Sequence, residues 1–373
     1  MKRYFPQGIA TDYTFCNRED ERAEIKASIE SHEHIVLIAP RRYGKSSLIT
    51  QVLNENDFPG ICIDLFFVLT QAEVTKTVTE GISKVIEALL PKTQKAGRKI
   101  VDAITALNPK LMISLLGQKV EISTKHNNER TISELLLALD QVAQKTKKSC
   151  VIVFDEFQQI AELKENHAIE AAIRHAVERS KMVSYIFCGS KRHLLNEMFS
   201  HKSRPLYHLC DLMSIGRIGT LSYHNFLNQM AKSKWRKKLD EDVIAEIIYL
   251  TESHPYYLNA LCRRLWRNTD APTLLDVRNV WDDYVGQQSV WIMDDLSHLT
   301  LNRRKVVAAL SFEPTNEPQG QVFSKRSDLS PSTIKRALKD LQKLDIIYQA
   351  EKGYYQVLDP VVSYFIRQRS SSL

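Results

Sequence analysis

Apolar and polar residues alternate in two ways along the first 220 residues. Short β-branched runs predict buried parallel strands, and longer segments with apolar residues every three or four positions predict helices. The strands are expected at 35–38, 60–64, 150–154, 182–189 and 212–218, and the helices at 15–33, 46–53, 71–90, 131–145, 161–181 and 192–199. The lead-in helix is expected to take Asn17 as its cap. Strands alternating with helices predict a doubly wound α/β domain with a parallel sheet over residues 1–220.

The next block carries only the helical period. Apolar residues mark helices near 226–230, 243–250 and 255–266, and Pro255 suits the first position of the third. We therefore predict a small helical lid domain over residues 221–285.

The last block, 286–373, predicts a winged helix-turn-helix domain. A helix at 301–310 is followed by a second helix that Ser330 caps, and two short strands then flank a turn at Gly353. The second helix is the candidate recognition helix, and the polar residues expected on its exposed face are Ser332, Lys335, Arg336, Lys339 and Lys343. Residues 91–130 are basic and show no clear period beyond a hairpin expected around Gly117.

Composition narrows the class of protein. The chain has 373 residues, of which 43% are hydrophobic and 25% charged, as in globular proteins of two or three domains. No apolar run approaches the length of a membrane span, and the first residues lack the apolar segment of a signal peptide, so we expect a cytoplasmic protein without membrane contact. The six cysteines show no C-x-x-C spacing, which argues against zinc. A formal charge of +7 is weak evidence for a polyanionic partner.

A phosphate-binding loop follows the first strand. Its residues are Ala39, Pro40, Arg41, Arg42, Tyr43, Gly44, Lys45, Ser46 and Ser47, in the order strand, loop, helix. Backbone amides at the start of the helix attract phosphate, and Lys45 would reach the β- and γ-phosphates. The hydroxyl of Ser46 would bind Mg²⁺. Ala39 stands where the pattern has its first glycine and adds only a methyl group.

Two carboxylates close the strand at 150–154. Asp155 would hold Mg²⁺, and Glu156 would act as general base toward the attacking water. Ser190 ends the following strand, where it would either orient that water or simply cap the strand.

Together these residues resemble an ASCE-class P-loop ATPase of the AAA+/STAND kind, close to the archaeal-type ATPases. The resemblance covers nearly the whole chain except 91–130. The matching segments are Phe15-Cys-Asn-Arg-Glu-Asp-Glu, Ala39-Pro-Arg-Arg-Tyr-Gly-Lys-Ser-Ser-Leu, Phe154-Asp-Glu-Phe-Gln, Gly189-Ser190, Pro205-Leu206-Tyr207, His254-Pro255-Tyr256-Tyr257-Leu and Leu358-Asp-Pro.

The resemblance implies further roles. Arg18 would lie near the adenine, Ser190 would be the sensor-1 residue, and His254 and Pro255 would join the lid to the nucleotide. Ser253 departs from the glycine that the family usually has there. The arginine finger would be Arg204, Arg217 or a residue of a second subunit.

The sequence thus predicts a switch that binds and hydrolyses Mg-ATP and contacts double-stranded DNA through its winged helix. The alternative is a signalling or scaffold ATPase whose winged helix contacts protein. A phosphotransferase is the third interpretation, although no acceptor pocket is recognisable and the Asp155-Glu156 pair suits water activation.

Overall fold

The computed structural model describes residues 3–90, 128–164, 166–350 and 353–370. The hairpin predicted around Gly117 therefore lies outside the described residues. The chain divides into two compact units, which are described separately. The sheet unit comprises Arg18–Arg41 and Leu48–Ile215, and the helical unit comprises Met1–Asn17, Arg42–Ser47 and Gly216–Leu373.

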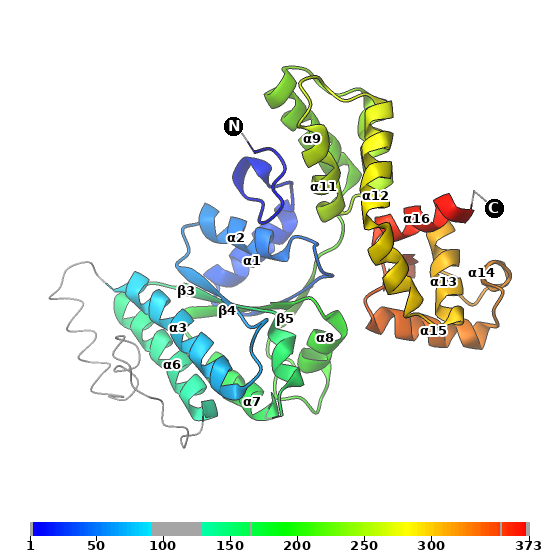
Figure 1. Ribbon diagram of the computed structural model, residues 1–373. Helices are drawn as coiled ribbons and strands as arrows, with labels where there is room; N and C mark the ends of the chain where they lie inside the picture. The colour runs from blue at the N-terminus through cyan, green and yellow to red at the C-terminus, as the bar shows by residue number, and fades with distance from the viewer. Residues whose placement is uncertain (1–2, 91–127, 165, 351–352, 371–373) are drawn as a thin grey trace. The chain divides into compact units, whose positions relative to one another are not determined.

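The sheet unit is built on five parallel strands in the order β2-β3-β4-β1-β5 (Figure 1). The strands are β1 (Ile35–Ile38), β2 (Gly60–Asp64), β3 (Cys150–Asp155), β4 (Val183–Gly189) and β5 (Asp211–Ser214). β3 and β4 are buried almost throughout, which explains their continuous apolar sequences. The predicted doubly wound α/β fold is confirmed.

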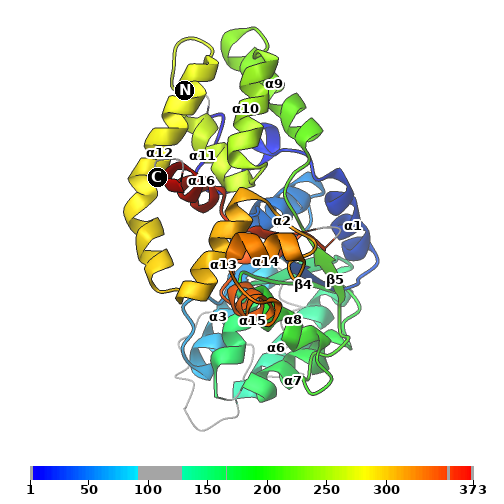
Figure 2. The same cartoon turned by 90° about the vertical axis from the view of Figure 1, so that its right-hand side faces the viewer.

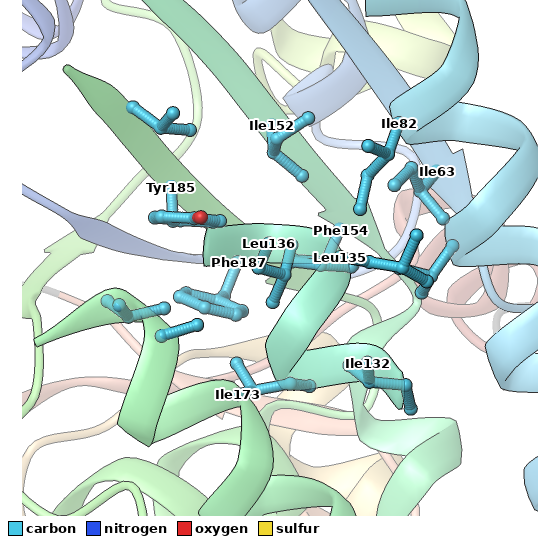
Figure 3. Packing of buried hydrophobic residues seen from close by; sticks show 14 of the residues in the cluster. Ile63, Ile82, Ile132, Leu135, Leu136, Ile152, Phe154, Ile173, Tyr185 and Phe187 are labelled. Atoms are coloured by element: carbon cyan, nitrogen blue, oxygen red, sulfur yellow. The ribbon is translucent and has the colours of Figure 1, made fainter. Parts of the chain in front are cut away.

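Helices cover both faces of this sheet. α1 (Glu19–Glu30) and α2 (Lys45–Glu55) lie on one face in Figure 1. On the other face lie α3 (Gln71–Leu89), α6 (Asn128–Thr146), α7 (Asn166–Val177) and α8 (Arg192–Ser200). Figure 3 shows Leu135 and Leu136 of α6 packed beside Phe154 and Phe187 of the central strands. The rings of Phe154 and Phe187 stack 5.5 Å apart, so β3 and β4 are held together by side chains as well as by backbone hydrogen bonds.

Three local predictions were wrong. The helix expected at 161–181 is split into a 3-10 helix (η2, Phe157–Glu162) and α7, because Leu163 has an extended backbone. Asn17 does not cap α1; Arg18 is the cap residue, with a φ of 63°, and the Asn17 side chain donates to Ser222 Oγ at 2.5 Å. The last strand ends at Ser214, short of residue 218.

The helical unit contains the rest of the chain from residue 216 (Figure 2). Its first helices are α9 (Thr220–Trp235), α10 (Glu241–Thr251), α11 (Pro255–Leu265) and α12 (Leu274–Ser297). α12 packs against α10 and α11 and also against the C-terminal helix α16 (Pro360–Ser370). The predicted boundary between residues 285 and 286 falls inside this unbroken helix, and the three-part division stays a prediction.

The winged-helix elements include the two helices and the hairpin that the sequence predicts, and in addition a short helix, α14 (Gln321–Ser327), to which the sequence analysis assigned no residues. The others are α13 (Leu301–Phe312), α15 (Pro331–Lys343) and the antiparallel strands β6 (Ile347–Gln349) and β7 (Tyr355–Val357). Ser330 caps α15 by accepting a hydrogen bond from the Thr333 amide, and Pro331 takes the first helical position. Among the described residues, no helix has the length and apolar character needed to cross a membrane.

Candidate nucleotide-binding site

The carboxyl ends of β1, β4 and β3 meet at one edge of the sheet. The register pairs Ile38 with Gly189 and Phe154 with Phe187, so Ala39, Ser190 and Asp155 leave three adjacent strands. Ligands of open parallel sheets bind at this edge. The P-loop therefore starts at the same sheet edge as β3, which carries the two predicted carboxylates, with β4 between them.

Glu156 is held by hydrogen bonds to only one of its carboxylate oxygens. Oε2 accepts from Ser190 Oγ at 2.8 Å, from the Ser190 amide at 3.4 Å and from Gln158 Nε2 at 2.5 Å. Oε1 has no hydrogen-bond partner in the part of the chain that the structure describes. The hydrogen bonds to Oε2 thus fix the orientation of the Glu156 carboxylate.

Asp155 is bound differently. Its Oδ1 accepts the Glu156 amide at 2.9 Å and faces the Cys188 thiol at 3.2 Å. The hydrogen-bond donors to Asp155 therefore differ from those to Glu156, which is consistent with the different roles predicted for the two carboxylates.

Gln158 is a site residue to which the sequence analysis assigned no role. Its side chain is fully buried, and it donates to Glu156. A Cβ on Gly189 would lie 1.8 Å from Gln158 Oε1, so any side chain at position 189 would displace the glutamine. Gln158 and Gly189 both belong to sequence motifs quoted above, but only the fold shows that the two residues are in contact.

The P-loop tip (Arg42–Ser47) belongs to the helical unit. Arg42 has a φ of 68° and Gly44 a φ of 88°, and α2 begins at Lys45. Among the described residues other than its two chain neighbours, none has an atom within 4 Å of a Cβ built on Gly44, so the backbone conformation and not crowding requires glycine. Ser47 Oγ accepts the Ala10 amide at 3.0 Å.

This arrangement fits a nucleotide triphosphate. The amides in the first turn of a helix have no carbonyl partners within the helix, and the helix dipole favours negative charge there. The first turn of α2 therefore carries these amides together with the Lys45 ammonium group and the Ser46 hydroxyl. These are the donors and the hard oxygen ligand that a phosphate and Mg²⁺ prefer. Asp155 as a further ligand of Mg²⁺ stays a prediction.

The first turn of α11 and its cap residue contact the two side chains before Gly44. The Arg42 guanidinium lies 4.4 Å from the centroid of the Tyr256 ring. Tyr43 packs edge to face on His254, with the ring centroids 4.7 Å apart. Pro40 is buried and Arg41 is exposed.

His254 is a neutral, buried helix cap. Its Nδ1 accepts the Tyr256 amide at 3.2 Å, and Pro255 follows at the first helical position. Burial lowers the pKa of His254 well below 6.5, and the charges of Arg217 and Arg42 lower it further. The structure thus places His254 against the P-loop side chain Tyr43, and its contact with nucleotide stays a prediction.

This pKa predicts a specific loss of stability in acid. Below about pH 6.5 the unfolded chain binds a proton at His254 and the folded protein does not. The free energy of unfolding should therefore fall by an extra 1.4 kcal/mol or so per pH unit. His254→Asn, which keeps a capping side chain, should lack this component. Urea unfolding of both proteins at pH 7.5, 6.0 and 5.5 measures the difference in slope, and equal slopes would contradict it.

Arg18 and the two candidates for the arginine finger have carboxylate partners. Arg18 is buried, and its Nη1 lies 2.8 Å from Glu21, so its role near the adenine stays a prediction. Arg204 forms a buried ion pair with Glu170. Arg217 Nη1 lies 2.7 Å from Glu252. Both candidates for the arginine finger therefore have structural partners within the chain.

Two family models match separate parts of the chain. Residues 15–261 match a family model described as an ATPase domain predominantly from Archaea, and residues 293–368 match one described as "Probable winged helix domain". No curated protein matches the sequence significantly.

Two solved structures resemble the whole chain. The Walker-type ATPase PABY2304 of Pyrococcus abyssi is 19% identical, with a TM-score of 0.68 over 98% of this chain and 99% of that one. The ORC2 protein of Aeropyrum pernix, in its ADPNP-ADP complexes, is 10% identical, with a TM-score of 0.55 over 100% and 99%. At these identities the likeness shows the fold, which is that of P-loop ATPases with a C-terminal winged helix.

Proposed function

The chain belongs to the family of ATPase domains found predominantly in Archaea, and on that premise we propose that it is a Mg-ATP-hydrolysing switch whose winged helix binds duplex DNA. One observation carries the proposal. Glu156 is oriented through Oε2 by Ser190 and Gln158, at the sheet edge from which the P-loop starts. This is the arrangement that a general base for water requires.

In this proposal the P-loop binds the triphosphate. Lys45 neutralises the β- and γ-phosphates, and Ser46 and Asp155 supply oxygen ligands for Mg²⁺. Bound Mg²⁺ would lower the charge of the phosphates during their transfer. The residues proposed to surround the rest of the nucleotide are Arg18, Pro40, Arg41, Arg42, Tyr43, Ser47, His254 and Pro255.

Hydrolysis then depends on the chain's own acid and base groups. Glu156 Oε1 accepts a proton from the attacking water while Ser190 and Gln158 hold Oε2 in place. ATP turnover measured with and without duplex DNA, together with the mass in solution with ATP, tests this function. Turnover that rises only when subunits associate would indicate that a second subunit supplies the arginine finger.

The DNA part of the proposal is supported by the charge on α15. Its five predicted polar residues, namely Ser332, Lys335, Arg336, Lys339 and Lys343, are all exposed. Asp340, the acid on this helix, forms an ion pair with Arg303 at 2.6 Å. The exposed face is therefore positive, as a helix that meets phosphates in a groove needs to be.

We expect Lys335→Ala with Arg336→Ala to weaken duplex binding and to lower the slope of log K against log salt by about 2, since each lost phosphate contact removes about 1. Fluorescence anisotropy of a labelled duplex at several salt concentrations measures this slope. The matched control is Lys237→Ala with Lys238→Ala, which removes the same charge from exposed positions between α9 and α10.

An equal loss in both variants would show that only net charge matters. Absence of duplex binding by the wild type at low salt would exclude the DNA role and favour the alternative, in which the winged helix contacts protein.

A further inference from the structure

Arg217 connects the tip of the P-loop to the winged helix. We propose that Arg217 and Tyr348 are positioning residues for the nucleotide site, through which the winged helix holds Tyr43 and so sets nucleotide affinity. This inference rests on the proposed function, because it requires that the P-loop binds a nucleotide.

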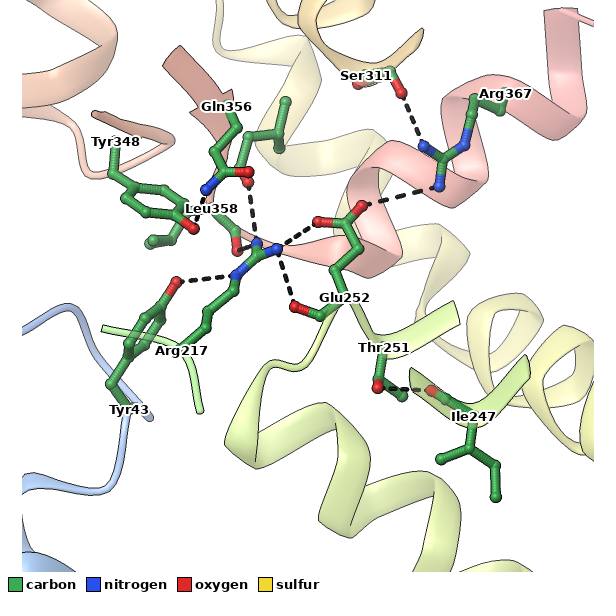
Figure 4. A network of polar contacts seen from close by, with 11 residues as sticks. Tyr43, Arg217, Ile247, Thr251, Glu252, Ser311, Tyr348, Gln356, Leu358 and Arg367 are labelled. Carbon is green, nitrogen blue, oxygen red and sulfur yellow. Dashed lines mark hydrogen bonds and ion pairs between the residues drawn. The ribbon is translucent and has the colours of Figure 1, made fainter. Parts of the chain in front are cut away.

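Arg217 joins three parts of the helical unit (Figure 4). Its Nε donates to the Tyr43 hydroxyl at 3.4 Å, and its Nη1 donates to the Glu252 carboxylate at 2.7 Å and carbonyl at 3.1 Å. Its Nη2 donates to the carbonyls of Leu358 at 3.1 Å and Val357 at 3.4 Å. The guanidinium fork therefore connects the P-loop tip, the end of α10 and the winged-helix hairpin.

Tyr348 of β6 completes this connection. Its ring lies 6.3 Å from that of Tyr43 and 5.4 Å from the Arg217 guanidinium carbon. Its hydroxyl accepts a hydrogen bond from Gln356 of β7. Tyr43 is 1% exposed and Tyr348 8%, so both rings are held on all sides.

Glu252 extends the network to the last helix. Its second carboxylate oxygen lies 3.8 Å from Arg367 Nη2, and Arg367 Nη1 donates to the Ser311 carbonyl at 2.9 Å. A movement of the winged helix would therefore have to break charged contacts at Glu252 as well as those at Arg217.

Arg42 has a second connection of the same kind. It lies over the Tyr256 ring, and Asp359, which precedes α16, is near enough for the Arg42 charge to act on its carboxyl group. Burial raises the pKa of Asp359, and the Tyr257 hydrogen bond and the Arg42 charge oppose that rise. Both side chains that precede Gly44 thus contact residues outside the P-loop.

These contacts matter because the P-loop backbone is unusual at this point. Arg42 has a left-handed backbone, which a residue with a Cβ adopts only at a cost. Anchoring the side chains of Arg42 and Tyr43 keeps the loop in the phosphate-binding shape before nucleotide arrives. Without the anchor a smaller fraction of molecules would be competent, and the apparent affinity would fall by that fraction.

ADP titration of the full chain by calorimetry tests the inference. We expect Tyr43→Phe, which loses the Arg217 hydrogen bond, and Tyr348→Leu, which loses the ring contacts with Tyr43 and Arg217, each to raise the Kd for ADP about fivefold. Arg217→Gln should raise it somewhat more. The Kd of the double tyrosine variant should be about the same as that of either single variant, because both substitutions break the same connection. The matched control is Tyr364→Phe, which removes a hydroxyl bonded to Asp282 at 2.7 Å in the same unit.

Hydrogen exchange supplies a readout that a purely structural role would not move. By reciprocity, ADP should slow exchange in β6 and β7 of the wild type and of Tyr364→Phe, and not in Arg217→Gln. Variants that keep their melting temperature and bind ADP as the wild type does would overturn this inference and leave the proposed function unaffected. A wild type that fails to bind ADP would overturn the proposed function as well.

Discussion

Replacing Lys45 with alanine is expected to weaken ATP binding about 100-fold and to remove measurable turnover. The loss corresponds to about 3 kcal/mol, since the ammonium group would make charge-assisted hydrogen bonds to two phosphates. Lys45 is the first residue of α2 and follows Gly44, whose positive φ turns the backbone into the helix. Titration with ATP by calorimetry and a phosphate-release assay measure the two effects.

The control is Lys76→Ala, which removes the same charge from an exposed position on α3. It should change neither the Kd nor the rate. Because Lys45 is buried, the melting temperature of each variant must be measured as well. A folded Lys45→Ala protein that binds ATP as the wild type does would remove Lys45 from the phosphate site.

Much of the fold could be predicted because its signals are local. Residues 35–38 and 150–154 are apolar throughout, so they had to be strands buried on both faces. Ser330, Pro331 and the period of α15 mark a helix start that needs no tertiary information. The glycine, lysine and serine of the P-loop are consecutive in the sequence, so the pattern that predicts phosphate binding is also local.

The errors occurred where distant residues decide the structure. Asn17 is a good cap by type, but Ser222 takes its side chain, and α1 starts one residue later. The period of residues 161–181 continues through Leu163, which gives no sequence sign of its extended backbone.

The site shows the same division. Asp155, Glu156 and Ser190 could be singled out because each follows or closes an apolar run that predicts a strand, whereas the adjacency of β3 and β4 is known only from the fold. Gln158 could not be singled out, because its contact with Glu156 needs the turn at Glu156, whose φ is 51°. Arg217 was considered as an arginine finger, and nothing in the sequence indicates its hydrogen bonds to Tyr43, Glu252 and Leu358.

Glu156→Gln is expected to keep ATP binding and to lower turnover about 100-fold or more, the contribution typical of a general base. The structure explains why the substitution should leave the orientation of the side chain unchanged. All three hydrogen bonds to the side chain reach Oε2, and the amide oxygen of glutamine can accept each of them. The NH₂ group would then replace Oε1, and an amide nitrogen cannot take a proton from water.

The control is Glu162→Gln, which neutralises the last residue of η2, the 3-10 helix that Glu156 precedes, where it pairs with Lys191 at the surface. It should leave turnover unchanged, since that pair is exposed and lies outside the Ser190 and Gln158 contacts. Single-turnover measurements separate binding from hydrolysis in both variants. If Glu156→Gln hydrolyses ATP at the wild-type rate, another group must accept the proton. The three hydrogen bonds to Oε2 would then have a structural role only.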